Sequence, residues 1–103
     1  MIVYTGVDYH KRTSTVSFAK EDGKFETKTV LSDNLVSFLS NKKNLLVGIE
    51  ASCGVNFIVD KLKAANINVK IINPNKFRGV GIDGKKSDKK DAEAIAECLK
   101  INI

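Results

Sequence analysis

The sequence predicts an α/β fold: a mixed five-stranded sheet of three antiparallel strands followed by two parallel strands, with helices on its faces. Residues 2–8 and 45–50 are almost continuously apolar and β-branched, which is typical of strands buried on both faces. Asp22-Gly23 joins two alternating segments, as in a hairpin. Apolar residues at helical spacing come before and after the second buried run.

The first half of the chain predicts an antiparallel meander. Residues 2–8 form its first strand, and residues 13–20 alternate between apolar and polar side chains after a polar turn. The hairpin signal Asp22-Gly23 follows, and residues 25–30 return as the third strand. Consecutive short turns of this kind leave neighbouring strands antiparallel.

A helix and a second buried strand come next. Ser32 or Asp33 is suited to cap a short helix over residues 35–39, and polar residues 41–44 close it. Residues 45–50 then form the buried strand. A helical crossover places this strand parallel to the first one.

The second half predicts a helix, a strand, a loop and a last helix. Apolar spacing favours a helix over residues 55–65, which Asn66 can end in the left-handed region. Residues 69–72 form a short strand that Asn73-Pro74 terminates, and residues 75–84 form a loop. Ser87 is in a position to cap the final helix.

Length and composition bound the class of protein. The 103 residues make one domain with one core, because a chain of this size buries roughly 60% or more of the surface that its unfolded chain exposes. Hydrophobic residues at 43% exclude a disordered tail. Cys53 and Cys98 lack metal-ligand spacing, so we expect reduced thiols and no zinc site. With no leader pattern or long apolar segment, we expect a cytoplasmic protein without a membrane span.

Two strands end on an acid in the same context. Gly6-Val7-Asp8 and Gly48-Ile49-Glu50 both have the order glycine, branched aliphatic residue, carboxylate. If these strands are parallel neighbours, both carboxylates lie at the same edge of the sheet. Ligands of open α/β sheets gather at this edge.

The last helix adds two more acids. Asp88, Asp91, Ile95 and Leu99 are three, four and four residues apart, so they share one face. The apolar part of this face should contact the core, and inward acids then require a compensating cation. The alternative is that the helix dipole favours Asp88 in the first turn and that Asp91 is solvated at a frayed edge.

Four converging carboxylates are untenable without a divalent metal. Their oxygens form a site that suits Mg²⁺ or Mn²⁺. Two such ions, about 3.5–4 Å apart, can activate a nucleophile and stabilise the leaving oxygen when a phosphodiester is displaced. We therefore expect two ions held by Asp8, Glu50, Asp88 and Asp91.

Basic residues are concentrated near the last helix. The net charge is +5, and residues 74–90 contain six basic against two acidic side chains. A basic segment beside clustered acids indicates a polyanion brought to a metal site, whereas the alternative is an ordinary solvated loop. The candidate nucleic-acid contacts are Lys11, Arg12, Lys76, Arg78, Lys85, Lys86, Lys89 and Lys90.

Other reactive side chains have simpler interpretations. His10 is the only histidine and lies near Asp8 in sequence, and we expect it to be a surface turn residue rather than an acid–base partner. Ser52 follows Glu50, but no base is paired with it, so a structural hydroxyl is favoured over a nucleophile. Phe77 with Arg78 is suited either to stacking on a base or to anchoring the loop.

Taken together, these motifs resemble the N-terminal domain of DEDD-type insertion-sequence transposases, which are related to the pilin-gene invertases of bacteria. The resemblance covers nearly the whole chain and implies a RuvC-like, ribonuclease H-like fold. It also implies that Asp8, Glu50, Asp88 and Asp91 are the catalytic tetrad. The segments that carry it are Gly6-Val7-Asp8, Gly48-Ile49-Glu50-Ala51-Ser52, Asn73-Pro74 and Lys86-Ser87-Asp88-Lys89-Lys90-Asp91-Ala92.

The resemblance also implies a bacterial or archaeal source, a partner domain and substrates. Members of the family recombine DNA, several of them guided by a structured RNA, and the full-length proteins are expected to be homo-oligomers. They carry a C-terminal domain with a serine nucleophile, to which nothing here corresponds. We thus expect residues 1–103 to be the catalytic part of a longer transposase and inactive alone. Ser52-Cys53-Gly54-Val55 departs from the usual Thr-Gly-Gly-Tyr of the family.

Three other functions fit parts of the pattern. One is a RuvC-type or ribonuclease H-type nuclease that is complete in itself and uses a metal-activated water. Another is a nucleic-acid-binding module whose acids are inactive. A sugar-kinase or actin-like ATPase lobe shares the strand order, but Tyr9-His10-Lys11-Arg12 lacks its glycine-rich phosphate turn.

Overall fold

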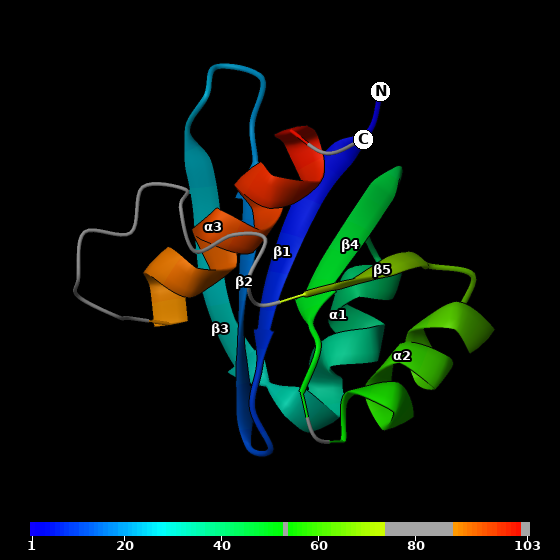
Figure 1. Cartoon of the computed structure of the whole chain (residues 1–103). Helices are drawn as coiled ribbons and strands as arrows, with labels where there is room; N and C mark the ends of the chain where they lie inside the picture. Colours follow the sequence, from blue (N-terminus) through cyan, green and yellow to red (C-terminus); the bar gives the residue numbers. More distant parts are fainter. Residues whose placement is uncertain (53, 74–87, 102–103) are drawn as a thin grey trace.

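One mixed sheet forms the centre of the molecule. The computed structural model describes residues 1–52, 54–73 and 88–101. The sheet strands are β1 (Val3–Tyr9), β2 (Thr13–Ala19), β3 (Phe25–Leu31), β4 (Leu45–Glu50) and β5 (Asn68–Ile72). Their order is β3-β2-β1-β4-β5, in which β1, β2 and β3 are antiparallel and β4 and β5 run parallel to β1 (Figure 1). The predicted sheet is confirmed, including its crossover.

The turn between β2 and β3 follows from its residues. Gly23 has a φ of 85°, a conformation that glycine adopts without steric cost. The Asp22 carboxylate accepts a hydrogen bond from the backbone N–H of Lys24 at 2.9 Å. Asp22-Gly23 therefore reverses the chain as predicted.

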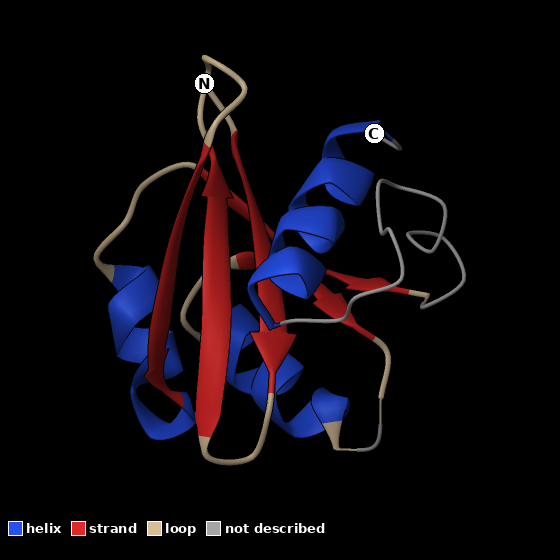
Figure 2. Cartoon of the chain, turned by 90° about the vertical axis from the view of Figure 1, so that its left-hand side faces the viewer, coloured by secondary structure: helices blue, strands red, loops and turns tan. Residues whose placement is uncertain are grey.

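Helices cover both faces of the sheet. A short 3₁₀ turn, η1 (Ser32–Asn34), leads into α1 (Leu35–Ser40), and α2 is Val55–Ala64. The last helix, α3, is Asp88–Ile101. Figures 1 and 2 show α3 across one face of the sheet and the other two helices against the opposite face.

The larger core lies between the sheet and the helices α1 and α2. Successive side chains of a strand point to opposite faces of the sheet, and the apolar side chains of one face point toward these helices. Each fully buried Leu, Ile or Val contributes about 1.5–3 kcal/mol by leaving water. The fully buried members are Val7, Val16, Val47, Ile49, Leu35, Leu39 and Leu62.

On the opposite face α3 packs directly on two glycines, a contact we call the glycine contact. A Cβ atom at Gly6 would lie 1.9 Å from the carbonyl oxygen of Ala92. At Gly48 a Cβ atom would lie 2.8 Å from a side-chain carbon of Leu99. Ile95 is also fully buried here. The absence of side chains at the two glycines therefore allows α3 to approach the sheet closely.

Two local predictions concern the ends of helices. Asn66 has a φ of 64° after α2, which confirms its left-handed conformation. The expected cap at Ser32 or Asp33 is wrong, since no side chain caps η1 or α1. Ser32 is buried, and its hydroxyl instead donates to the carbonyl of His10 and bonds to the hydroxyl of Ser14 at 2.7 Å.

Several predictions lie outside the described residues. They concern the loop 75–84, the cap at Ser87, the side chains of Cys53 and Phe77, and the basic residues Lys76, Arg78, Lys85 and Lys86. In the described ranges, no helix combines the length and the apolar character needed to cross a bilayer.

Candidate active site

The register of the sheet brings the two strand-end acids side by side. Gly6 pairs with Gly48 and Val7 pairs with Ile49 in the parallel ladder between β1 and β4. One step further along this ladder, Asp8 and Glu50 lie opposite each other. Because side chains alternate, they occupy the face on which α3 packs. The matching tripeptides thus correspond to matching positions on neighbouring strands.

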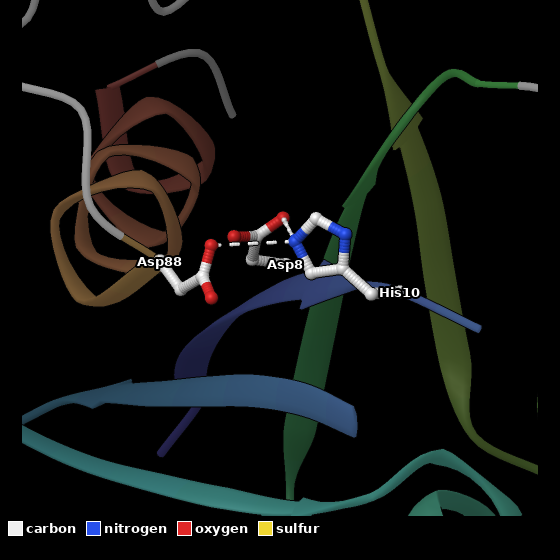
Figure 3. A group of neighbouring side chains, drawn as sticks. All are labelled: Asp8, His10 and Asp88. Carbon is white, nitrogen blue, oxygen red and sulfur yellow. Dashed lines mark ion pairs between the residues drawn. The ribbon is translucent and has the colours of Figure 1, made fainter. Parts of the chain in front are cut away.

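Asp88 reaches this edge from α3 and meets Asp8 through a histidine. The Nε2 atom of His10 lies 3.2 Å from Oδ1 of Asp8 and 3.3 Å from Oδ1 of Asp88. Figure 3 shows the imidazole directed at both carboxylates. One potential ligand atom from each residue lies within 4.8 Å of the others. We call these three residues the Asp8–His10–Asp88 cluster.

Asp8 carries an electrostatic cost at this position. Only 6% of the residue is exposed, and its Oδ2 atom is buried with no hydrogen-bond partner in the described part of the chain. Burial raises the pKa of Asp8 to about 6, and the neighbouring carboxyl of Asp88 adds to this increase. His10 acts in the opposite direction. A cation beside Oδ2 would remove this cost.

His10 is held in place by its backbone. The hydroxyl of Ser32 donates to the carbonyl oxygen of His10, and the N–H of Ser32 donates to the carbonyl of Arg12 at 2.9 Å. These bonds fix the turn after β1 while the imidazole remains 55% exposed. Burial by itself would lower the pKa of His10, but the charges of Asp8 and Asp88 raise it overall.

Glu50 opens onto the same hollow as Asp8 and His10. This cavity has a volume of ≈ 520 Å³ and is lined by residues at and just after the ends of β1 and β4. Glu50 itself is half-buried. The lining residues are Asp8, Tyr9, His10, Lys11, Glu50, Ser52 and Gly54.

Asp91 lies one turn along α3 from Asp88 and is half-buried. The predicted apolar stripe below the two acids is confirmed, since Ile95 and Leu99 are buried against the sheet. Among the described residues, the group within ligand distance contains neither Asp91 nor Glu50. The side chain of His10 therefore links Asp8 and Asp88, and Glu50 shares a cavity with Asp8 and His10.

Exposed basic residues surround this edge of the sheet. Lys11 and Arg12 lie in the turn after β1, and Lys89 and Lys90 lie in the first turn of α3. Lys89 and Asp88 line a second hollow of ≈ 340 Å³, together with Phe25 and the hydroxyl-bearing Thr15, Thr27 and Thr29 of β2 and β3. Lys11 thus shares a hollow with Asp8, and Lys89 shares one with Asp88.

Sequence reasoning assigned His10 to a surface turn and did not connect it with Asp88. It does lie in an exposed turn, but its ring contacts both acids. A histidine two residues after a strand-end aspartate was a local signal for proximity to Asp8. Its second contact depends on how α3 packs, which sequence spacing does not reveal.

Two comparisons with known proteins found similarity to a family and to a solved fold. A DEDD family model of the IS110 type, described as a transposase, matches residues 5–102. A solved structure of Thermus thermophilus RuvC is similar, with a TM-score of 0.63 and 12% identity over 94% of this chain and 92% of that chain. This likeness confirms the expected ribonuclease H-like fold. A comparison with curated protein sequences gave no match.

Proposed function

The chain belongs to the DEDD transposase family, and from this membership we propose that it is the catalytic domain of a metal-dependent DNA transposase or site-specific recombinase. The family indicates an enzyme that cuts nucleic acid, with DNA as its substrate, and implies the use of a divalent metal. The finer proposal is that this domain takes part in both cutting and joining of DNA phosphodiesters.

We propose that Asp8, Glu50, Asp88 and Asp91 hold the metal. The observation that carries this proposal is the buried Oδ2 atom of Asp8, which has no partner in the described chain and lies beside a second carboxylate. An unpaired buried carboxylate is costly, and a hard cation is the partner that best offsets this cost. The donors fit Mg²⁺ or Mn²⁺, because both ions prefer carboxylate oxygens.

The ions, two in our proposal, supply Lewis-acid stabilisation of phosphate charge and activation of the attacking group when bound. The protein contributes rigid placement of their ligands. Asp8 and Glu50 project from paired strands, and the glycine contact fixes α3, which carries Asp88 and Asp91. Ligands held on strands and a packed helix lose little freedom when a substrate binds.

The basic edge supports DNA as the substrate of the site. Lys11, Arg12, Lys89 and Lys90 are exposed near the carboxylates, and the chain has a net charge of +5. Such side chains bind the phosphate backbone without reading its sequence. We include Lys76, Arg78, Lys85 and Lys86 in this proposed contact on the basis of the sequence alone.

The proposal extends to parts beyond this domain. From the family resemblance, we propose that residues 1–103 act with a further domain that bears a nucleophilic serine, within a homo-oligomer. A structured guide RNA is part of the same proposal. Recombination by the full-length protein, with and without RNA transcribed from the insertion sequence itself, tests the roles of the further domain and of the RNA.

The direct test is strand cleavage and joining by the full-length protein in Mg²⁺ or Mn²⁺. Asp8→Ala and Asp88→Ala should each lower the rate at least about 100-fold, since loss of a metal ligand removes several kcal/mol of transition-state stabilisation. Asp60→Ala, at an exposed position of α2, is the matched control and should keep activity. Recombination that survives Asp8→Ala would instead favour a binding module with inactive acids.

A second candidate is a nuclease that is complete in itself, which the likeness to a RuvC fold favours. Incubation of residues 1–103 with branched DNA or an RNA–DNA hybrid in Mn²⁺ separates the two. Metal-dependent hydrolysis by this domain alone would support the nuclease. Binding without hydrolysis would support the transposase domain that requires its serine-bearing partner.

A further inference from the structure

His10 is a nitrogen donor at the edge of a site otherwise made of carboxylates. It is the only histidine in the sequence. Its Nε2 atom contacts one oxygen of Asp8 and one oxygen of Asp88, and both carboxylates lie on the same side of the ring (Figure 3). The proposed tetrad leaves this side chain without a role.

The spacing of the three donor atoms matches the inner shell of a small divalent ion. Adjacent ligands of an octahedral ion with bonds of about 2.1 Å are separated by about 3.0 Å. The Nε2 atom lies 3.2 Å and 3.3 Å from its two carboxylate oxygens. All three atoms fall within 4.8 Å of one another. An ion can therefore enter between them with only small side-chain movements.

The surroundings of His10 are suited to ligation. Hydrogen bonds from Ser32 hold the backbone of the turn, so the ring approaches the acids from a fixed position. The imidazole is 55% exposed, which leaves room for it to adjust. The unpartnered Oδ2 atom of Asp8 provides another donor on the buried side.

We propose that His10 is a metal ligand of this site, binding one divalent ion through Nε2 together with the carboxylates of Asp8 and Asp88. This inference rests on the proposed function, because it concerns the same metal site. A mixed nitrogen and oxygen donor set has a consequence for metal preference. Imidazole suits transition metals such as Zn²⁺ and Fe²⁺, and Mn²⁺, although it prefers oxygen, accepts nitrogen more readily than Mg²⁺ does.

The experiment is electron spin-echo spectroscopy of Mn²⁺ bound to the chain, purified without a histidine tag. Coupling of the Mn²⁺ electron spin to an imidazole ¹⁴N nucleus reports direct ligation and needs no enzyme activity. Since the chain has a single histidine, such a signal can be assigned to His10. We expect the ¹⁴N signal in the unchanged protein and its loss in His10→Gln.

Metal titrations of the same proteins provide the second readout. His10→Gln should weaken Mn²⁺ binding by at least about tenfold, because even loss of an outer hydrogen-bond partner commonly costs this much. Its effect on Mg²⁺ binding should be smaller. Lys43→Gln, at an exposed position before β4, is the control and should leave Mn²⁺ affinity unchanged.

The outcomes distinguish this inference from the proposed function. Tight Mn²⁺ binding without ¹⁴N coupling, or coupling that persists in His10→Gln, would overturn the role of His10 and leave the carboxylate site intact. If the unchanged protein binds no Mn²⁺, both the metal site and the role of His10 are wrong.

Discussion

The contact between α3 and the sheet has two ends that differ in packing and charge. At the glycine contact, Gly6 and Gly48 lie under the backbone and apolar side chains of the helix. Two residues further along the same strands, Asp8 and Glu50 open onto a cavity. The first end is apolar and close-packed, and the second contains acids and an exposed histidine.

This difference shows how one helix serves both stability and chemistry. Close packing at the glycines fixes the position of α3 and so determines where Asp88 lies relative to Asp8. The acidic end is destabilised by a buried carboxylate oxygen of Asp8 that has no hydrogen-bond partner among the described residues. We infer that the glycine contact offsets an electrostatic cost at the site.

Gly6→Ala should have the largest effect on this contact. The added Cβ would lie 1.9 Å from the carbonyl oxygen of Ala92 and 2.6 Å from the backbone nitrogen of Ala96, so the helix must move. We expect the free energy of unfolding to fall by about 3 kcal/mol or more, measured by urea denaturation. Mn²⁺ affinity should fall with it, because movement of α3 carries Asp88 away.

Gly48→Ala is the matched control for Gly6→Ala. Here the Cβ would meet side-chain atoms of Leu99 at 2.8 Å and 2.9 Å, which can shift more readily than backbone. A loss of about 1–2 kcal/mol is therefore expected. A variant at Gly6 that is no less stable than the one at Gly48 would contradict the close packing of α3 on β1.

Asp8→Asn should stabilise the protein at neutral pH in the presence of EDTA. The folded-state pKa of Asp8 is about 6, against an ordinary value of 3.8, so the folded protein binds this proton more tightly than the unfolded chain. Its contribution to stability is therefore greatest below about pH 4 and is lost as the pH rises to about 6. Asparagine does not ionise and avoids this loss.

We expect the free energy of unfolding to rise by about 1–3 kcal/mol in Asp8→Asn at pH 7.5, and to change little at pH 4. The attraction of His10 is already included in the pKa of about 6. Thermal or urea denaturation at the two pH values measures the change in stability. Lower stability of the variant at both values would show that the buried carboxylate carries no such cost. The variant should also lose Mn²⁺ binding, which would separate stability from function at one residue.

Lys89→Gln should have the smallest effect and tests which end of α3 faces DNA. Lys89 is exposed beside Asp88, whereas Lys100 is exposed in the last turn of the helix. Loss of one phosphate contact should weaken DNA binding a few-fold and reduce the slope of log affinity against log salt by about 1. Fluorescence anisotropy at several salt concentrations measures both.

Lys100→Gln is the control for this comparison because it removes the same charge from the opposite end of α3. It should leave the salt slope of DNA binding unchanged. Equal losses for both variants would indicate that DNA responds to the net charge of the domain rather than to the acidic edge.

Much of the fold was predictable because its signals are local. Alternating and continuous apolar runs identified the strands, and Asp22-Gly23 identified the hairpin, which the structure contains. The repeated order of glycine, aliphatic residue and acid placed Asp8 and Glu50 together, as the register between β1 and β4 shows. The helical spacing of Ile95 and Leu99 likewise identified the buried face of α3.

Contacts between distant segments were not predictable in the same way. Ser32 has the side chain of a helix cap, but its burial beside the turn after β1 gives its hydroxyl other partners. His10 meets Asp88 only because α3 packs on the glycines. Sequence spacing reports which residues share an element and a face, whereas these bonds depend on the distance between elements.

The central claim is that acids from two strands and one helix bind divalent metal at a single edge of the sheet. Its most direct measurement is the anomalous scattering of Mn²⁺ in a crystal of residues 1–103. The account predicts a peak within bonding distance of the carboxylates of Asp8 and Asp88. Full Mn²⁺ occupancy elsewhere in the crystal, with no peak between these two side chains, would contradict it.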